Sequence, residues 1–552
     1  MYVLRRQESL NPRMKCVRAF MSADFSLSFI MPKRTLSPTP LLPPAKRQQI
    51  DANTLRPIAL SFDDLFYEEL ILLVFSQLSW SELCAAEAVN KNWQRISLDN
   101  GLWREQYIRV FGRSRLRGGK GFAGRSDGRE VRPLPGRAVK ALDLKDWRWM
   151  FRISWNWKKG RCRTEHIEGV FKPPEPGSTP SLAPPHVVLT GSTTIIASSE
   201  TSMCPEVHCL HTGGGPTSQQ TLLCDSRGPR GPCSIAALAL DQSAPRARLL
   251  QLAAFLSTGE FLVFAVDEQN PRATARKLTY IPQRPSSRTT AIIQAVFHYP
   301  LLISLSEAFT LSIYDLSADT VKHTQTLTTY TAFPPTSLVL SAQPGDRYKL
   351  VLTYAMPVFP VHFSIGATEL IIASSHDPMA SLTVISTRTA RALDVPPGWI
   401  DQDKLRCLRE QWSRKLLHIQ DTQSDGKWIV VGPGESPPGN TVPGPVDSLT
   451  SLQMYRLSLP AASSVASPPP KLTFIRYLHH SAGAVSSMAL ADGRCVTLGK
   501  NGSIWVWDLE SGAGAMVSSP SASIVERSTV VFDDRRIISA RAGKLVIHRF
   551  DI

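Results

Sequence analysis

Apolar residues near the start of the chain recur at helical spacing, three and four positions apart: Phe66, Leu70, Leu73, Val74 and Leu78. This spacing predicts a helix with one apolar face. Ser79 with Glu82 three residues later predicts a second helix start, because each side chain can satisfy a backbone N–H of the other. Leu83, Ala86 and Val89 are expected to form the buried face of that helix. Three or four such helices would have a very small core, which usually needs a partner or a neighbouring domain.

The pattern changes after about residue 185, where short apolar runs alternate with Gly, Pro, Asp or Ser. Such runs predict β-strands. Several segments share the same order of strand, turn, strand, turn and strand. In each, the last strand ends in an apolar residue followed by Asp: Val266-Asp267, Tyr314-Asp315, Trp507-Asp508 and Phe550-Asp551. About 370 residues at about 45 to 50 per repeat predict seven or eight repeats of a β-propeller, with seven favoured. DKLRCLREQWSRKL from Asp403 is expected to be an inserted helix.

Composition narrows the class of protein. Of 552 residues, 43% are hydrophobic, and 42 prolines fit a loop-rich β-protein better than a long helical bundle. The net charge of +16 is concentrated between Arg109 and Arg163, where 17 Lys and Arg face 4 Asp and Glu. A local basic run is typical of a solvated loop, so nucleic acid is not the expected partner. No apolar run approaches the ~18 residues of a membrane span.

The N-terminal region, residues 1–57, is predicted to be disordered because it is basic and proline-rich, above all from Met31 to Asp51. PPAKRQQID, with Lys46-Arg47, resembles a nuclear-import signal. Few acidic residues before Met31 leave a mitochondrial presequence as an alternative, and Met31 could itself be the start. The nine scattered cysteines indicate a reducing compartment. Nucleus, cytoplasm or both are therefore the expected location.

The segment from Leu65 to Tyr107 resembles the F-box family. Glu69-Leu70, Val74-Phe75-Ser76 and Leu102-Trp103 stand in register with the family pattern, whereas Tyr67 replaces the usual Pro. The resemblance implies binding to a Skp-type adaptor, and through it to a cullin scaffold, by these residues: Phe66, Tyr67, Leu70, Val74, Phe75, Leu78, Leu83, Val89, Trp93, Leu102 and Trp103. The alternative is that they form only the core of an unrelated helical domain.

A second resemblance begins at Asp146. Trp147-Arg148 and Asn156-Trp157-Lys158-Lys159-Gly160 resemble the linker that joins F-box and propeller in F-box WD-repeat proteins, where the second of these motifs forms a turn. Whether or not the resemblance holds, burial of the indoles of Trp147, Trp155 and Trp157 between domains is expected to couple them rigidly. The predicted organisation is α+β and multidomain, with these parts: a disordered region (1–57), an F-box (58–111), a basic Gly/Arg-rich loop (112–145), a Trp-rich linker (146–184) and a degenerate WD-repeat-like propeller (185–552).

The propeller region is similar to WD repeats chiefly at NGSIWVWDLESG from Asn501, and less closely at TLSIYDLS from Thr310. The combined resemblance implies the substrate receptor of an SCF-type ubiquitin ligase with unknown protein targets, and the sequence leaves open whether these targets must be phosphorylated. No catalytic set, cofactor or metal site is predicted; Cys204, His208, Cys209 and His211 have poor zinc spacing. The alternatives are a nuclear propeller scaffold that contacts protein or nucleic acid without a cullin, and a propeller enzyme.

Overall fold

The computed structural model describes residues 62–111, 146–169 and 184–552, the last range with interruptions at 192, 212–217, 227–230, 244–248, 268–273, 283–290, 318–319, 329–330, 332, 360, 375–381, 396–397, 435–450, 460–468, 480–483, 492, 521–527 and 542–543. The predicted disordered region (1–57) and basic loop (112–145) lie outside the described residues. The chain divides into two compact units, Met1–Leu65 and Phe66–Ile552, and of the first only the short helix α1 (Phe62–Leu65) is described.

Five further helices precede the strands: α2 (Glu68–Gln77), α3 (Trp80–Ala86), α4 (Lys91–Ser97), α5 (Asn100–Phe111) and α6 (Trp147–Lys159). The predicted cap of α3 is confirmed, since Ser79 and Glu82 form a reciprocal capping box. Asp99 begins α5 by accepting from the backbone N–H groups of Gly101 and Leu102. None of the described helices is long and apolar enough to cross a bilayer.

A single apolar core joins these helices. Its buried members come from all five of them: Ile71, Phe75, Leu83, Ala86, Ile96, Leu102, Trp103, Tyr107, Met150 and Phe151. Several rings meet edge to face, as in Trp103 on Phe151 at 5.4 Å between centroids, an arrangement that suits the ring quadrupoles. Val89 departs from its predicted place: α3 ends at Ala86, and the Val89 side chain is exposed.

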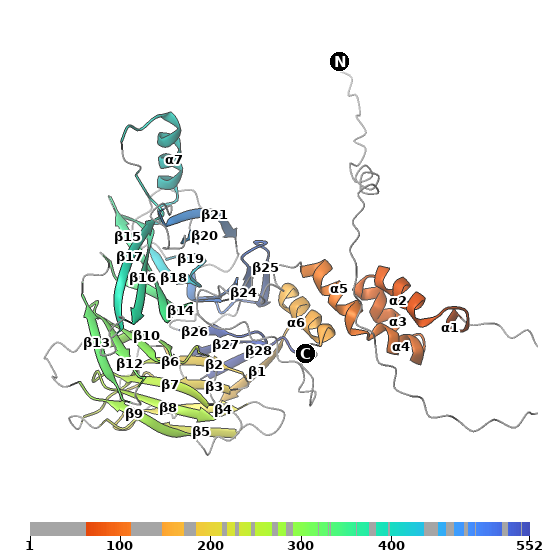
Figure 1. The fold of residues 1–552 in the computed structure, drawn as a ribbon, viewed down its shortest axis with the longest axis horizontal. Helices are drawn as coiled ribbons and strands as arrows, with labels where there is room; N and C mark the ends of the chain where they lie inside the picture. The colour runs from red at the N-terminus through yellow and green to blue at the C-terminus, as the bar shows by residue number, and fades with distance from the viewer. Residues whose placement is uncertain are drawn as a thin grey trace, which may run out of the picture. The chain divides into compact units, whose positions relative to one another are not determined.

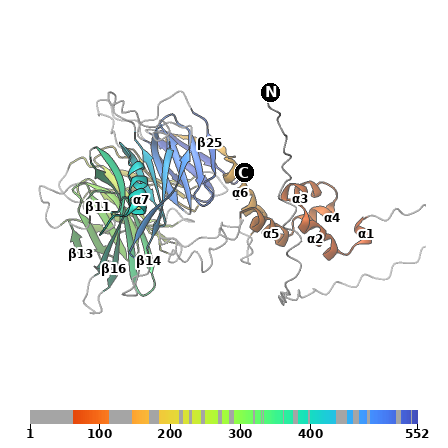
Figure 2. The same cartoon turned by 90° about the horizontal axis from the view of Figure 1, so that it is seen from above.

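Seven four-stranded antiparallel sheets form the remainder, which confirms seven blades (Figures 1 and 2). Blades one to three comprise β2 (His186–Thr190), β3 (Thr193–Ala197), β4 (Glu206–His211), β5 (Ser218–Leu223); β6 (Ile235–Leu240), β7 (Leu249–Leu256), β8 (Phe261–Asp267), β9 (Ala275–Tyr280); and β10 (Ile292–His298), β11 (Leu301–Ser306), β12 (Leu311–Asp315), β13 (Lys322–Leu327).

Blades four to six comprise β14 (Pro335–Gln343), β15 (Arg347–Val358), β16 (His362–Ser374), β17 (Leu382–Arg391); β18 (Ile419–Ser424), β19 (Trp428–Pro433), β20 (Ser451–Ser458), β21 (Lys471–His479); and β22 (Val485–Ala491), β23 (Arg494–Gly499), β24 (Ile504–Asp508), β25 (Gly514–Ser518). Blade seven comprises β26 (Thr529–Phe532), β27 (Arg536–Arg541), β28 (Lys544–Arg549) and β1 (Arg163–Glu168). The predicted inserted helix is present as α7 (Gln402–Ser413), between β17 and β18.

The ring is closed by a strand from the other end of the propeller sequence. β1 pairs with β28 over six residues, from Arg163↔Arg549 to Glu168↔Lys544. The inner strands β2, β6, β10, β14, β18, β22 and β26 contact one another in turn around the ring. β1 falls inside the segment predicted as a linker, so propeller structure begins before residue 185. A closed ring leaves only short, outer sheet edges.

The core of the propeller lies between adjacent blades. Leu252, Ala254 and Leu256 of β7, for example, are fully buried, and they pack with β3 and β4 of the preceding blade. The predicted apolar–Asp endings fall on equivalent strands: Asp267, Asp315 and Asp508 end the third strands of blades two, three and six, and Phe550 directly follows β28.

Candidate functional site

Helix α2 and the turn before it present apolar side chains on the outside of the helical core. Phe66, Tyr67, Leu70, Leu73 and Val74 are between 42% and 81% exposed. On the opposite side of α2, Ile71 and Phe75 are buried in the core. The helix is therefore apolar on two faces, and only one of them is covered within the described chain. Contiguous exposed apolar surface of this kind marks an interaction site.

The structure divides the eleven predicted adaptor-binding residues into three groups. Phe66, Tyr67, Leu70, Val74 and Val89 are exposed. Leu78 and Trp93 are half-buried and pack against the helical core. Phe75, Leu83, Leu102 and Trp103 are at most 5% exposed, so they support the helices from within and are not available for direct contact. Leu73, which is 61% exposed, belongs to the apolar face of α2 although it was not among the eleven.

Polar contacts that the sequence did not predict hold α2 against its neighbours. The guanidinium of Arg95 in α4 donates to both carboxylate oxygens of Glu68, at 2.9 and 2.8 Å. From α5, Arg109 donates to the Ser76 carbonyl at 2.9 Å and Gln106 to the Leu78 carbonyl at 2.7 Å. These last two contacts satisfy carbonyls at the end of α2, where no intrahelical partner exists. They fix the orientation of the exposed face.

The F-box-like family model matches residues 68–109, which are α2 to α5. These helices are an F-box-like domain. A second similarity is to an F-box protein of Saccharomyces cerevisiae, 26% identical over 126 residues, which is 20% of this chain and 19% of that protein. The match thus spans about a fifth of the relative.

Two solved structures resemble the propeller at low similarity. The β-propeller domain of Cps50 (Swd1) from Myceliophteria thermophila is 10% identical with a TM-score of 0.37, covering 66% of this chain and 98% of that one. The computationally designed Ika8 protein is 13% identical with a TM-score of 0.32, covering 66% of this chain and 82% of that one.

Helix α6 connects the F-box-like domain to the propeller through two different faces. Trp155 packs on Trp80 of the F-box-like domain with ring centroids 4.8 Å apart, and Phe151 lies in the same core. Trp157 is buried among propeller residues and stacks on Phe550 at 3.9 Å. The three predicted linker tryptophans therefore separate: Trp147 and Trp155 belong to the helical core, and Trp157 belongs to the propeller core.

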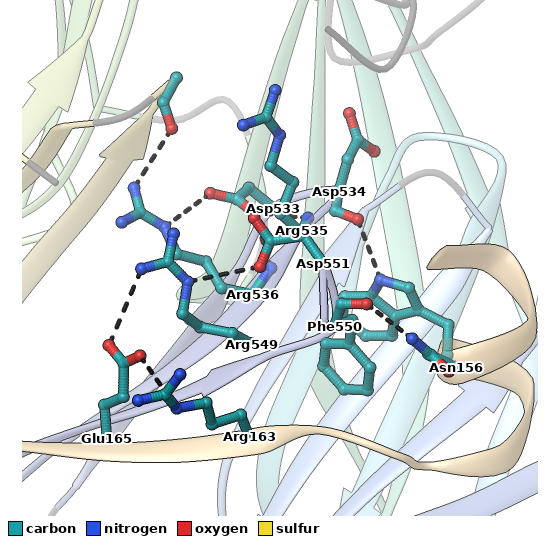
Figure 3. Close-up of polar contacts among 12 residues, drawn as sticks. Asn156, Arg163, Glu165, Asp533, Asp534, Arg535, Arg536, Arg549, Phe550 and Asp551 are labelled. Carbon is teal, nitrogen blue, oxygen red and sulfur yellow. Dashed lines mark hydrogen bonds and ion pairs between the residues drawn. The ribbon is translucent and has the colours of Figure 1, made fainter. Parts of the chain in front are cut away.

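Two hydrogen bonds fix α6 on the closing blade. Asn156 donates to the Phe550 carbonyl, and the indole N–H of Trp157 donates to the Asp534 carbonyl, both at 2.9 Å (Figure 3). Gly160 ends the helix with φ +66°, and a Cβ there would lie 2.2 Å from the Met516 carbonyl oxygen. Only glycine fits both the left-handed backbone and this close approach. Asn156 and Trp157, predicted as a turn, are thus the end of the helix.

Charged side chains reinforce the ring closure beside α6. Glu165 of β1 lies between Arg163 and Arg549, with N–O distances of 3.7 and 3.8 Å, and Arg549 also contacts Asp551 at 3.3 Å (Figure 3). Arg536 is only 3% exposed. It pairs with Asp533 and donates to two carbonyls of blade one, so its charge is compensated within the protein.

His548 of β28 faces β1 and is buried. Its Nδ1 lies 3.2 Å from the Thr164 hydroxyl and 3.7 Å from the Cys162 thiol. Burial, with a smaller effect of nearby His166, lowers the pKa of His548 to about 4. The ring is therefore neutral at physiological pH.

The two cysteines considered for zinc, Cys204 and Cys209, lie in blade one, and Cys224 directly follows its last strand. Burial raises the pKa of Cys209 and of Cys224 to about 12, so both thiols are protonated at neutral pH. Within the described ranges, no three His, Cys, Asp or Glu side chains are grouped to hold a metal. His211 instead lies within hydrogen-bond distance of the Thr193 hydroxyl at 2.8 Å.

Strand order assigns the two faces of the propeller. In an antiparallel blade, the first-to-second and third-to-fourth turns share one face, and the other connections share the opposite face. Helix α6 contacts Asp534 in a first-to-second turn and Phe550 directly after a third strand. The α7 insertion and the β15–β16 turn lie on the opposite face. Inner strands begin on that opposite face as well.

Proposed function

We propose that this protein is the substrate receptor of an SCF-type ubiquitin ligase, which binds a Skp-type adaptor through its F-box-like domain and protein targets through its propeller. The observation that carries the proposal is the uncovered apolar face of α2, on helices that match the F-box-like family. Such a receptor has no catalysis of its own: the bound cullin and its enzymes transfer ubiquitin, and the receptor supplies proximity.

The chemistry of the exposed face fits a helical partner. Leu70, Leu73 and Val74 lie along one side of α2, and Phe66 and Tyr67 extend the surface at its start. Burial of apolar area in a groove between helices yields about 25 cal/mol per Å². The Arg95–Glu68 and Arg109–Ser76 contacts hold α2 in place before binding, which lowers the entropic cost of association.

Tyr67 is the best support for a second candidate, a scaffold that does not recruit a cullin. It replaces the proline usual in the family, and it is 81% exposed at the beginning of α2. If Tyr67 prevents adaptor binding, the F-box-like domain would only support the propeller. Nuclear or cytoplasmic location remains part of either proposal.

The test is binding of the purified full chain to a recombinant Skp-type adaptor, measured by calorimetry. Leu70→Ala combined with Leu73→Ala should weaken Kd about 100-fold, because each truncation removes about 1 to 2 kcal/mol at a central contact. The matched control is Ile385→Ala, an equally exposed apolar residue on β17 of the propeller. No adaptor binding by the wild type would favour the scaffold, and an equal loss of affinity in the control would contradict binding through the apolar face of α2.

Ubiquitin transfer separates the two candidates further. With adaptor, cullin and conjugating enzyme added, the receptor should itself become ubiquitinated when no target is present. A chain that binds the adaptor without supporting any transfer would contradict the receptor role.

A further inference from the structure

We propose that a cavity on the propeller axis binds a basic side chain, lysine or arginine, of a target polypeptide. The inference concerns targets and so rests on the receptor role proposed above, although the binding itself can be measured without an adaptor. Three features support it: the position of the cavity, the hydrogen-bonding atoms left for a ligand, and the absence of positive charge among the described residues of its wall.

The cavity lies where inner strands of five blades converge. Its volume is about 200 Å³, and its polar wall consists of His186, Gln294, Ser337 and Gln423. These residues belong to β2, β10, β14 and β18, and β6 contributes Ala237 and Leu238. Most wall residues occupy the first four positions of their strands. The cavity is therefore nearer the face opposite α6, where inner strands begin.

Three wall residues each already use one side-chain donor within the protein. Gln294 donates its Nε2 to the Thr336 carbonyl at 2.7 Å, and Gln423 donates its Nε2 to the Asp421 carboxylate at 2.9 Å. His186 places Nε2 at 3.1 Å from the Ile235 carbonyl. Since a carbonyl and a carboxylate only accept, these atoms must be the N–H groups. This assignment also fixes the orientation of both amides.

The acceptor atoms of these residues remain for a ligand, together with the second N–H of each amide. The Oε1 of Gln294 is buried and has no hydrogen-bond partner among the described residues. Burial lowers the pKa of His186, so the ring is neutral at neutral pH and its Nδ1, without a proton, is an acceptor. Oε1 of Gln423 and the hydroxyl of Ser337 can accept as well. A buried acceptor without a partner is costly, and a ligand rich in N–H groups would remove that cost.

Charge favours a cation over an anion. No Lys or Arg occurs among the described residues that line the cavity, so a phosphate would find no counter-charge there. Asp421 lies one hydrogen bond beyond Gln423 and also accepts from the Met488 backbone N–H at 3.0 Å. Burial raises the pKa of Asp421 to about 6, which leaves the group mostly ionised at pH 7.5. Its negative charge therefore lies directly behind the Gln423 side chain.

The apolar part of the wall fits the carbon stem of a long basic side chain. Ile293, Ala295, Val296 and Leu338 can contact methylene groups while the charged end reaches the acceptors. None of the described wall residues is Phe, Tyr or Trp. An aromatic cage for a methylated ammonium is therefore lacking among them, and the expected ligand is an unmodified lysine or arginine.

The test uses the full chain at pH 7.5 and fluorescein-labelled seven-residue Gly/Ser peptides that differ at the central position, read by fluorescence anisotropy. Lysine or arginine at the centre should bind at least about tenfold more tightly than norleucine, which keeps the stem and lacks the charge. Trimethyllysine, with charge and no N–H, should bind as weakly as norleucine. Equal affinity for lysine, arginine and norleucine would overturn the proposal.

Variants place the binding in the cavity. Gln294→Met and Ser337→Ala each remove one acceptor and should weaken binding of the basic peptide severalfold, whereas Gln251→Met on β7, outside the cavity, should not. Unchanged binding in both cavity variants, with melting temperatures equal to that of the wild type, would contradict the assignment. If Gln294→Met fails to fold, Ser337→Ala still decides.

Two further measurements identify the source of the ligand and distinguish the cavity proposal from the receptor proposal. Spermidine that binds more tightly than any basic peptide would indicate a small amine as the ligand, and the polypeptide part of the proposal would be wrong. The Leu70→Ala, Leu73→Ala variant should retain peptide binding. Peptide binding by a wild-type chain that does not bind the adaptor would overturn the receptor role and leave the cavity assignment intact.

Discussion

Trp155 and Trp157 of helix α6 lie two positions apart and serve different domains, so the same substitution at each should destabilise a different region. Trp157 is 2% exposed, stacks on Phe550, and donates to the Asp534 carbonyl. Trp155 is half-buried and packs on Trp80 in the F-box-like domain. Trp157→Ala should therefore loosen the closing blade, and Trp155→Ala should loosen the helices.

The magnitude follows from what Trp157 loses. Truncation of a buried Trp costs about 3 to 5 kcal/mol, and the Asp534 carbonyl also loses its donor. A reduction of about 4 kcal/mol in the free energy of local opening corresponds to about a thousandfold loss of protection from hydrogen exchange. The loss should appear in β27, β28 and β1, which meet at the contact.

Hydrogen exchange read by mass spectrometry on both variants is the suitable assay, because it reports each region separately in a multidomain protein. Trp155→Ala should speed exchange in α3 and α6 and leave β27 and β28 unchanged. The reasoning would be refuted by normal exchange of the closing blade in Trp157→Ala, or by the same regional pattern in both variants.

Three further predictions concern stability. Gly366→Ala should destabilise the propeller by about 1 to 3 kcal/mol, because the new Cβ would lie 2.3 Å from the Tyr354 ring. Differential scanning fluorimetry should show this as a lower melting temperature. Gly231→Ala is the control, since open space surrounds that residue and little effect is expected. Ser79→Ala should destabilise α3 by about 1 kcal/mol through loss of the capping box, seen as faster exchange of its first turn. For His548, the folded pKa of about 4 lies below that of the unfolded chain. The unfolded state thus binds the extra proton first, and stability falls by up to about 3 kcal/mol as pH drops from about 6.5 to 4. His548→Gln should remove that dependence when melting temperatures of the variant and the wild type are compared across this range, and an unchanged pH profile would contradict it.

Helical spacing predicted which residues share a face of α2 and could not tell which face is inward. Val74 and Phe75 are neighbours and equally apolar, yet one is exposed and the other is 2% exposed. The choice depends on where α4 and α5 pack, and that is fixed by contacts such as Arg95–Glu68, 27 residues apart in sequence. Such contacts have no local signal, so the predicted site combined core and surface residues.

The propeller strands were predictable where they are apolar, and β1 was not. RTEHIE alternates charged and polar residues and contains one large apolar side chain, Ile167. Its strand conformation comes from pairing with β28, which lies nearly 380 residues later. Asn156 was likewise predicted in a turn. Its hydrogen bond to the Phe550 carbonyl spans 394 residues, so the sequence around Asn156 gives no sign of it. Long-range pairing, and not propensity, decides both.

The closing blade both completes the propeller ring and holds the F-box-like domain, whereas the cavity lies apart from these contacts. Because β1 follows α6 directly and pairs with β28, the contacts that complete the ring also hold the F-box-like domain. A substitution such as Trp157→Ala should therefore disturb closure and domain coupling together. The cavity lies toward the opposite face, and strands of about six residues at about 3.3 Å each separate the two faces by about 20 Å. Variants of Gln294 or Ser337 should then change target binding without affecting adaptor binding, since the contacts that hold α6 are made at the other face.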